Sequence, residues 1–253
     1  MKRSIRDWKK PIGPLNVWKI IEGKERLADG SLKTVRFSLQ DIPEIRFEDA
    51  VNQMCANFIS DEVMCKSLDL KNDPDAVRDF GELWHYLLKL GLSIGAFKLN
   101  SKDEITELVG LNILFVSTDE MDQVLEDFTK NFRSPKSRLI FELMHEISEQ
   151  ADVRNIYGVD RYISALGLSI VPAYRGQKLG VHLLKIRDDI GKKYDIPATS
   201  TIFSAVTSQT QAERAGFEVA LEKNYSEFKD EHGNPLFPTI ECKSVKQMIK
   251  RLQ

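Results

Sequence analysis

Apolar positions follow two different periods along the chain. Near the N-terminus, the short apolar segments VWKII and TVRFSL flank Asp29 and Gly30, which predicts a pair of strands joined by a turn. Over residues 47–58 the apolar positions recur every three or four residues, the period of an amphipathic helix. This helix is expected to end before Asp61 and Glu62, so the two acids lie where a helix gives way to a loop.

The same periods continue through the middle of the chain. Asp73 and Pro74 are typical of a helix start, and a single apolar stripe runs from there to Gly91. The segments SIGAFKL and ELVGLNILFV follow as two short apolar runs around polar turn residues, which predicts a hairpin. Residues 119–150 are charged, with apolar positions at helical spacing in two groups, so we expect two helices there.

The second half of the chain alternates strand and helix patterns. The run YISALGLSIV is mostly apolar and predicts a buried central strand, followed by the loop AYRGQKLG and a helix that opens near Gln177. Next come the apolar run STIFSAV, a short helix that ends near Gly216, and strands within FEVALEKNYSEF and PTIECKSV. This alternation predicts a mixed α/β fold in one domain that covers residues 1–253 and is more antiparallel in its first half.

The balance of charges limits the partners of the protein. Its 253 residues include 36 Lys and Arg and 38 Asp and Glu, a formal net charge of -2. The chain therefore has no overall positive field that would gather phosphate backbones or anionic lipid headgroups. We expect neither nucleic acid nor a membrane as a partner.

Cysteine usage and the N-terminal segment indicate the compartment. Cys55, Cys65 and Cys242 are odd in number and widely spaced, and no His stands at a metal-ligand interval from them. We therefore expect reduced thiols and no metal. The basic N-terminal segment reaches Pro11 without the apolar core of a signal peptide, and no later apolar run approaches ~20 residues. The sequence predicts a cytoplasmic protein.

One loop has the features of a phosphate site. It joins the predicted central strand to the next helix and contains Arg175, Gly176, Gln177, Lys178, Leu179 and Gly180. Unpaired N–H groups at a helix N-terminus, together with the positive end of the helix dipole, bind anions such as a pyrophosphate. Glycine at such a junction is also ordinary turn chemistry, so the loop alone leaves both interpretations open. The chain has no Walker loop and no G-x-G-x-x-G motif after a strand, which argues against kinase and dinucleotide-binding classes.

Five ordered segments carry a family resemblance. They are RFSLQDIPEIRFEDAV, FISDEVMCKSL, YISALGLSIVPAYRGQKLG, ATSTIFSAVTSQTQAERAGFE and KSVKQMI. In this order they resemble the GNAT acetyltransferases, and more closely the insect arylalkylamine N-acetyltransferases. The family loop reads Gln/Arg-x-x-Gly-x-Gly/Ala; Arg175 and Gly180 match it, while Lys178 stands where the family usually has Gly. The resemblance implies a central mixed, mostly antiparallel sheet with helices on both faces.

The resemblance also implies the residues of the site. The catalytic base of the family falls on Glu62, followed here by Val63 in place of the usual Pro, and a pair of serines falls on Ser204 and Ser208. Acetyl-CoA is the implied co-substrate, and no metal is implied. Its pyrophosphate is expected on the loop that contains Arg175 and Gly180. Its pantetheine arm is expected to pair like an added strand with the backbone of Leu168, Ser169 and Ile170.

These residue types suit acyl transfer to an amine. An alkylamine with a pKa near ~10.4 is protonated at neutral pH, so a base must remove a proton before it attacks a thioester, and Glu62 is the candidate. The expelled thiolate belongs to a thiol with a pKa near ~8.5, and a hydroxyl beside the sulfur assists its departure. We assign that hydroxyl to Ser208, with Ser204 ordering substrate or water. The plainer alternatives are a solvated acid, a strand serine and a helix-capping serine.

The leading functional hypothesis is direct acetyl transfer from acetyl-CoA to an arylalkylamine such as dopamine, tyramine, serotonin, octopamine or tryptamine. A second hypothesis keeps the chemistry but changes the acceptor to a polyamine or agmatine, or lengthens the acyl chain. A third is a coenzyme A binding module that has lost catalysis. In the first two the partner is a small-molecule amine, and the sequence leaves open which amine it is.

Overall fold

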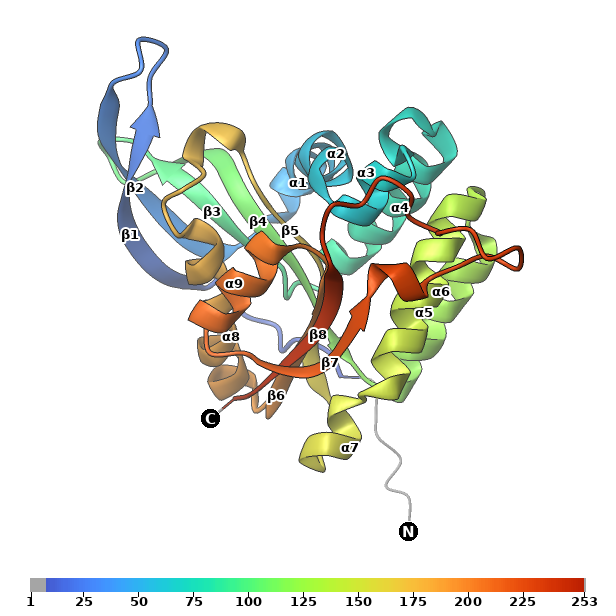
Figure 1. Cartoon of the computed structure of the whole chain (residues 1–253). Coiled ribbons are helices and arrows are strands. Elements are labelled where there is room, and N and C mark those ends of the chain that lie inside the picture. The colour runs from blue at the N-terminus through green and yellow to red at the C-terminus, as the bar shows by residue number, and fades with distance from the viewer. Residues whose placement is uncertain (1–7, 253) are drawn as a thin grey trace.

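An eight-stranded mixed sheet forms the frame of the protein (Figure 1). The computed structural model describes residues 8–252. The strands lie in the order β1-β2-β3-β4-β5-β6-β8-β7, and all neighbours are antiparallel except β5 and β6, which are parallel. Their bounds are β1 Val17–Arg26, β2 Leu32–Asp41, β3 Ile94–Leu99, β4 Ile105–Ser117, β5 Tyr162–Ile170, β6 Ala198–Phe203, β7 Glu218–Asn224 and β8 Ser244–Arg251. The predicted mixed, mostly antiparallel sheet is confirmed.

The helices largely follow the predicted periods. Their bounds are α1 Phe47–Gln53, α2 Ile59–Asp61, α3 Val63–Ser67, α4 Pro74–Lys89, α5 Asp119–Asn131, α6 Pro135–Gln150, α7 Val153–Tyr157, α8 Leu179–Tyr194 and α9 Val206–Arg214, with a π-helical turn at Met54–Phe58. The two helices expected within residues 119–150 are confirmed as α5 and α6. The helix expected over residues 47–58 continues through the π-helical turn to Asp61. The apolar pattern does not predict the short α7.

The helices α4 and α6 begin with the same capping arrangement. Asp73 caps α4 by accepting the N–H groups of Asp75 and Ala76, both at 3.1 Å, and Ser134 caps α6; a proline follows each cap. A proline suits the first helical position because that N–H has no partner inside the helix. The Ser134 hydroxyl donates to Asp73 at 2.7 Å, and this bond holds the pKa of the Asp73 carboxyl below its usual value. The starts of α4 and α6 are thus tied together.

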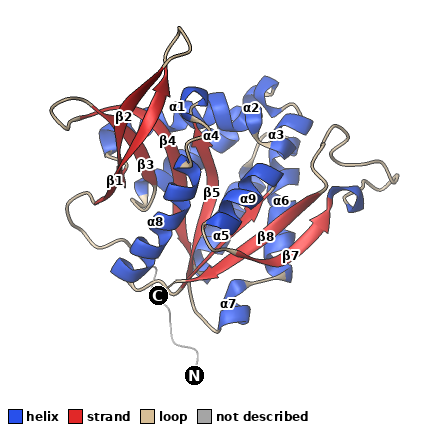
Figure 2. Ribbon diagram, turned by 60° about the vertical axis from the view of Figure 1, so that its left-hand side comes forward, coloured by secondary structure: helices blue, strands red, loops and turns tan. Residues whose placement is uncertain are grey.

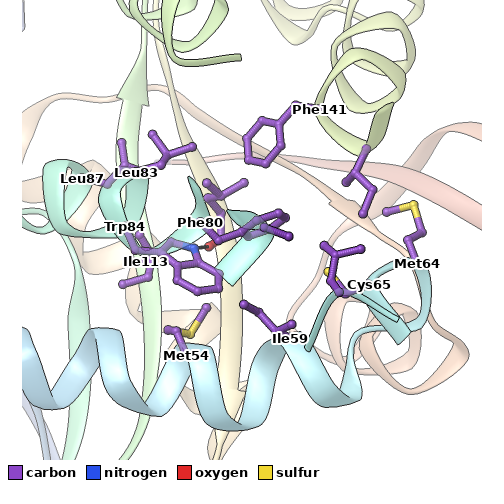
Figure 3. Close-up of a cluster of buried hydrophobic side chains, with 14 of the residues drawn as sticks. Met54, Ile59, Met64, Cys65, Phe80, Leu83, Trp84, Leu87, Ile113 and Phe141 are labelled. Carbon is purple, nitrogen blue, oxygen red and sulfur yellow. Dashed lines mark hydrogen bonds between the residues drawn. The ribbon is translucent and has the colours of Figure 1, made fainter. Parts of the chain in front are cut away.

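Helices cover both faces of the sheet, as expected (Figure 2). On β4, the side chains of Leu111, Ile113 and Phe115 lie in one hydrophobic core with residues of α1 to α6, and Figure 3 shows part of this core around Trp84. Leu114 and Val116 lie in a second core on the opposite face, which α8 covers. This alternation is the period of a strand that is buried on both faces.

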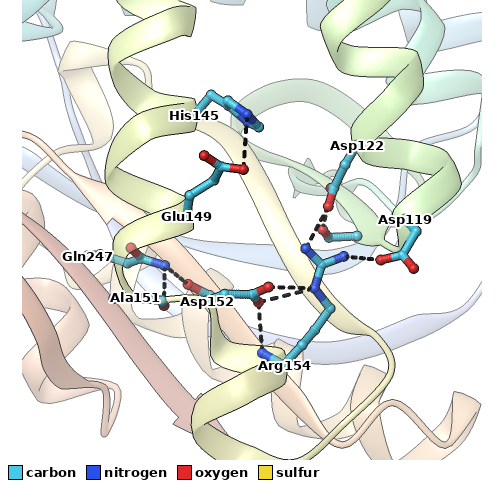
Figure 4. A network of polar contacts seen from close by, with 10 residues as sticks. Asp119, Asp122, His145, Glu149, Ala151, Asp152, Arg154 and Gln247 are labelled. Atoms are coloured by element: carbon cyan, nitrogen blue, oxygen red, sulfur yellow. Dashed lines mark hydrogen bonds and ion pairs between the residues drawn. The ribbon is translucent and has the colours of Figure 1, made fainter.

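Arg154 of α7 forms ion pairs with three aspartates (Figure 4). The Arg154 guanidinium lies 2.9 Å from Asp119, 2.8 Å from Asp122 and 3.0 Å from Asp152. Asp122 also accepts a hydrogen bond from the Ser117 hydroxyl at the end of β4, at 2.8 Å. The network therefore joins α5 to α7, the helix that leads into β5.

The helix α8 starts slightly later in the sequence than Gln177, so the predicted start is wrong. The helix begins at Leu179. The residues Gly176 and Lys178 have φ angles of 80° and 64°, in the left-handed region that a right-handed helix excludes. The loop therefore extends up to the first turn of α8.

The strand expected in PTIECKSV is wrong except at its end. β7 stops at Asn224 and β8 starts at Ser244, and the part of the intervening segment that leads into β8 passes over α3 (Figure 1). There the Thr239 hydroxyl lies 3.2 Å from the Ser67 hydroxyl, and Ile240 packs against the first core. Apolar residues that are buried by tertiary packing produce a strand-like pattern without strand pairing.

No helix within residues 8–252 is both long enough and apolar enough to cross a membrane. Over the same range, no group of three or more His, Cys, Asp or Glu side chains is arranged to hold a metal ion. Residues 1–7, where the basic N-terminal segment begins, lie outside the described residues.

Trp84→Phe is expected to lower the free energy of unfolding by about 1–3 kcal/mol, measured by urea denaturation. Trp84 is fully buried, and its indole N–H donates to the Leu166 carbonyl at 2.9 Å, so phenylalanine leaves that carbonyl without a donor and opens space. Tyr86→Phe on the same helix is the control, because the Tyr86 hydroxyl makes no hydrogen bond to the described residues. Equal losses in the two variants would contradict the prediction.

Candidate active site

The sheet splits between its two parallel strands. Among the described residues, β5 and β6 are joined in register only at Ile163 and Thr199, where the Thr199 hydroxyl also donates to the Ile163 carbonyl at 2.7 Å. Beyond this point β5 stays paired with β4 as far as Ile170, whereas β6 pairs with β8. We call the opening between β5 and β6 the fork. The residues predicted to bind pantetheine lie along it, namely Leu168, Ser169 and Ile170.

A β-bulge interrupts β5 beside the fork. One residue of β4, Ile113, faces two residues of β5, Leu166 and Gly167. The Leu166 carbonyl accepts the Trp84 indole N–H at 2.9 Å. The Gly167 carbonyl accepts the side-chain amide of Asn112 at 2.8 Å. Two side chains from other elements therefore hold the bulge in place.

Gly167 suits the bulge for two reasons. Its φ of 104° lies in a region that residues with a side chain rarely adopt. A Cβ atom at this position would lie 2.5 Å from the Met54 methyl and 3.1 Å from the Phe58 ring. Met54 and Phe58 belong to the π-helical turn that leads into α2, so the segment that ends at Asp61 packs directly on the bulge.

The predicted phosphate loop leads from the end of β5 to α8. Gly176 and Lys178 adopt the left-handed φ angles of 80° and 64°. Within the described chain, no backbone hydrogen bond uses the N–H groups of Gly176, Gln177 or Lys178. The helix that follows is 16 residues long, and its N-terminus adds the positive end of a dipole. The loop can therefore accept an anion through its backbone.

Two side chains anchor this loop to the sheet. The Gln177 amide bonds both backbone groups of Lys24 on β1, so only the backbone of Gln177 is available to a ligand. The Tyr174 hydroxyl lies 2.7 Å from a Glu107 oxygen and 3.0 Å from a Glu25 oxygen. Burial and these two carboxylates raise the pKa of Tyr174, which keeps its proton at neutral pH.

Arg175 connects the loop with the helix that precedes Glu62. Its Nε donates to the Ile170 carbonyl at 2.8 Å, and its guanidinium lies 2.5 Å from the carboxylate of Asp61. The two side chains are 45% and 51% exposed, so this ion pair contributes only about 0–1 kcal/mol. A phosphate group can therefore displace Asp61 from Arg175 at small cost.

Leu179 and Gly180 form the first turn of α8, and both are buried. Leu179 packs in the second core, under the sheet. A Cβ atom at Gly180 would collide with the Gln211 side chain of α9. Leu179 and Gly180 therefore allow α8 to pack closely against its neighbours. Only the backbone N–H groups of these two residues can bind an anion.

Glu62 lies at the junction of α2 and α3, so the predicted helix end is close to this point, but Asp61 belongs to α2 and a second helix rather than a loop follows Glu62. Its backbone is extended, with ψ of 129°, and one carboxylate oxygen caps α3 by accepting the Cys65 N–H at 2.7 Å. The other oxygen, Oε1, is buried and has no hydrogen-bond partner among the described residues. A buried carboxylate oxygen without a donor is costly, and it is free to accept a proton or hydrogen bond from a ligand.

Tyr225 is a residue of this region that the sequence pattern does not reveal. It is 4% exposed, and its hydroxyl donates to the Ser204 carbonyl at 2.8 Å. Burial raises the pKa of Tyr225, and the nearby negative charge of Glu62 raises it further. A buried tyrosine needs a partner for its hydroxyl, but its partner here is 21 residues away in the sequence, and only the fold brings the two together.

Two contacts near Glu62 involve the residues that follow β5 and β6. On one side its neighbour Asp61 contacts Arg175, just after the end of β5. On the other side the Tyr225 hydroxyl, whose pKa Glu62 influences, contacts Ser204 just after the end of β6. The fold thus links the segment around Glu62 to the loop before α8 through Asp61 and Arg175, and it joins Tyr225 to the backbone of Ser204.

Ser208 lies in the first turn of α9. Its hydroxyl donates to the Ala205 carbonyl at 2.8 Å and accepts the Ala205 N–H at 3.3 Å. The plainer alternative, that Ser208 is itself the N-cap, is wrong: the N-cap is Ala205, and Ser208 bonds back to it from the third position of α9. Donation to a ligand would require the hydroxyl to rotate away from Ala205. Ser204 is partly buried, and its carbonyl is the group that Tyr225 engages.

Comparison with known proteins gives matches among solved structures. No protein-family model and no curated protein matches the chain. A protein assigned as arylalkylamine N-acetyltransferase 7 of the yellow fever mosquito Aedes aegypti matches with a TM-score of 0.84 and 30% identity, over 98% of this chain and 100% of that one. Arylalkylamine N-acetyltransferase 2 of the same mosquito matches at 0.76 and 19%, over 86% and 99%. A Drosophila melanogaster polyamine N-acetyltransferase, which forms N-acetylagmatine, matches at 0.72 and 16%, over 85% and 100%.

A mixed sheet that forks between two parallel strands, with a loop-to-helix junction beside the fork, is the architecture of the GNAT fold, and these solved structures share it. The identity and coverage of the first match go further than the fold. The chain belongs to the family of insect arylalkylamine N-acetyltransferases. The family resemblance found in the sequence is confirmed over nearly the whole chain.

Lys178→Gly is expected to raise the free energy of unfolding by about 1 kcal/mol, because glycine adopts a left-handed φ without the steric cost that a Cβ atom brings. The measurement is urea denaturation of both proteins. Lys178→Ala keeps the Cβ atom and removes the charge, so it should give no gain. A gain as large in the alanine variant would assign the effect to the lysine charge and contradict the conformational explanation.

Proposed function

We propose that the protein is an acetyl-CoA-dependent N-acetyltransferase that acts on a small primary amine, with residues 1–253 working as one acyltransferase domain. The observation that carries the proposal is the fork, whose unpaired β5 edge leads into an anion-accepting loop, together with the buried, unpartnered Oε1 of Glu62, whose neighbour Asp61 contacts Arg175 of that loop. A thioester carrier with a pyrophosphate and two amides is complementary to this surface. Membership of the arylalkylamine N-acetyltransferase family supports the same activity.

Acetyl-CoA is proposed to lie along the fork. Its pantetheine amides pair with the backbone of Leu168, Ser169 and Ile170, as an added strand would. Its pyrophosphate meets the N–H groups of the loop and the positive end of α8, with these residues contributing: Arg175, Gly176, Gln177, Lys178, Leu179 and Gly180. Arg175 exchanges Asp61 for a phosphate oxygen, which the weakness of that exposed ion pair permits.

The proposed reaction is direct attack by the amine on the thioester. Glu62 takes a proton from the ammonium group, directly or through water, and the neutral amine then attacks the acetyl carbonyl. The tetrahedral intermediate collapses by expelling the thiolate of coenzyme A. Ser208 is proposed to give its hydroxyl hydrogen bond to that thiolate, and Ser204 to order substrate or water.

An arylalkylamine is the proposed class of acceptor. The rings of Tyr225, Phe228 and Phe237 are buried and pack edge to face, with centroids 5.8–6.4 Å apart. The charge of Glu62 raises the pKa of Tyr225, and we propose that this buried aromatic group borders the region of the base and favours an aromatic ring there. The name of the mosquito match supports the same class. The Drosophila match, which forms N-acetylagmatine, keeps a non-aromatic amine as the second candidate.

Glu62→Gln is expected to lower kcat at least tenfold in a thiol-release assay, because glutamine cannot take the proton from the ammonium group. Glu48→Gln is the matched control, since Glu48 lies on α1 with 77% of its side chain exposed, and it should keep full activity. An unchanged kcat in folded Glu62→Gln protein would contradict the assignment of the base.

The same assay decides the acceptor class when aromatic monoamines, polyamines and amino acids are compared. The proposal predicts the highest kcat/KM with an aromatic monoamine. Turnover restricted to polyamines or agmatine would keep the reaction and overturn the acceptor. Coenzyme A binding without turnover on any amine would instead identify a binding module.

Ser208→Ala is expected to lower kcat roughly tenfold, with little change in the KM for the amine, because the leaving thiolate loses a hydrogen-bond donor. Ser204→Ala should have a smaller effect. The comparison is made by steady-state kinetics on both variants, with folding checked by circular dichroism. Equal activity of Ser208→Ala and the unchanged protein would leave Ser208 with only its capping bonds to Ala205.

A further inference from the structure

Arg187, in the third turn of α8, is a fully buried arginine. Its guanidinium donates to the hydroxyl of Thr199 at 3.0 Å, to the hydroxyl of Thr201 at 2.8 Å and to the side-chain oxygen of Asn112 at 2.9 Å. All three acceptors are neutral, and among the described residues Arg187 forms no ion pair with a carboxylate. Its Nε is buried without a hydrogen-bond partner in the same range.

The contacts of Arg187 lie on both sides of the fork. Thr199 and Thr201 belong to β6, and Thr199 is the residue at which β6 leaves β5. Asn112 belongs to β4, and its amide donates to the Gly167 carbonyl in the β5 bulge at 2.8 Å. A continuous line of hydrogen bonds therefore runs from β6 through Arg187 and Asn112 to the bulge.

Stability alone does not explain this arginine. Burial lowers the pKa of Arg187 to about 9, so the guanidinium still carries its charge at neutral pH. The charge lies over the aromatic ring of Phe217, whose centroid is 5.5 Å away. Removing a charge from water without an opposite charge is costly, and well-packed apolar residues often replace buried charges without loss of stability. The presence of a charged side chain at this position therefore indicates that it helps to set the geometry of the fork.

We propose that Arg187 is a positioning residue of the acyl-transfer site: through Asn112 it fixes the Gly167 carbonyl and the β5 bulge, and through Thr199 and Thr201 it holds β6 at its distance from β5. The fixed bulge sets the direction of the backbone edge at Leu168, Ser169 and Ile170. This inference rests on the proposed function, because that edge is where the thioester carrier is proposed to bind. Arg187 itself does not touch the reacting atoms in this account.

Arg187→Met tests the proposal, because methionine fills a similar volume and removes the charge and the hydrogen bonds. The kcat/KM for acetyl-CoA is expected to fall at least about tenfold, since small misplacements of a bound thioester cost up to roughly a hundredfold. The KM for the amine should change less than about twofold. The melting temperature without ligand should stay the same or rise, because an unpaired buried charge is removed.

A double-mutant cycle with Asn112→Leu tests the line of hydrogen bonds. If Arg187 acts through Asn112, the two substitutions together should lower kcat/KM for acetyl-CoA little more than either does alone. Fully additive effects would overturn the connection. A lower melting temperature together with unchanged kcat/KM per folded molecule would show that Arg187 serves stability only, and would overturn the proposal.

A second variant and a binding measurement cover the cases in which Arg187→Met does not fold or no amine is acetylated. If Arg187→Met does not give folded protein, Arg187→Lys is measured instead; its single point charge cannot bridge both strands, so the same fall in kcat/KM is expected. The rise in melting temperature that coenzyme A causes is measured in parallel, without any amine. A smaller rise in the variant supports the proposal even if no amine is acetylated, so failure of the proposed acetyltransferase activity is separate from failure of the Arg187 proposal.

Discussion

The single register pair between β5 and β6 is the constraint on which the rest of the structure depends. Parallel strands normally continue side by side, but here the Thr199 hydroxyl binds the Ile163 carbonyl and the strands then diverge. The divergence leaves backbone groups of β5 without a strand partner, which a β-sheet ordinarily avoids. The buried guanidinium of Arg187 lies at this point and bonds β4 and β6. A sheet that is open on one side of a central strand leaves backbone groups of that strand able to pair with an added extended segment.

The two walls of the opening are coupled through the segment between α2 and α3. The π-helical turn before α2 packs on the Gly167 bulge, Asp61 pairs with Arg175 of the loop before α8, and the charge of Glu62 raises the pKa of Tyr225. The segment therefore contacts both the bulge and the loop. The ion pair of Asp61 and Arg175 thus joins the segment around Glu62 to the loop before α8, although the two are more than a hundred residues apart in the sequence.

Local patterns predict the elements of this fold better than its contacts. The helices α4 and α6 were predictable because an apolar stripe follows a capping residue and a proline, and β5 because it is apolar on both faces. The strand expected in PTIECKSV is wrong because its apolar residues are buried by packing over α3 rather than by strand pairing. Tyr225 and Arg187 carry no local signal, since their partners Ser204 and Asn112 are distant in the sequence. The position of Glu62 was predictable, but its role was suggested only by family resemblance.

The central claim is that the open edge of β5 and the loop before α8 together bind coenzyme A. Amide hydrogen exchange, followed with and without saturating coenzyme A, tests it most directly, because each backbone N–H that gains a hydrogen bond exchanges more slowly. The account predicts slower exchange in two stretches, residues 168–170 and residues 176–181, with little change in β1 or β7. Coenzyme A binding that protects neither stretch, or only amides remote from the fork, would contradict it.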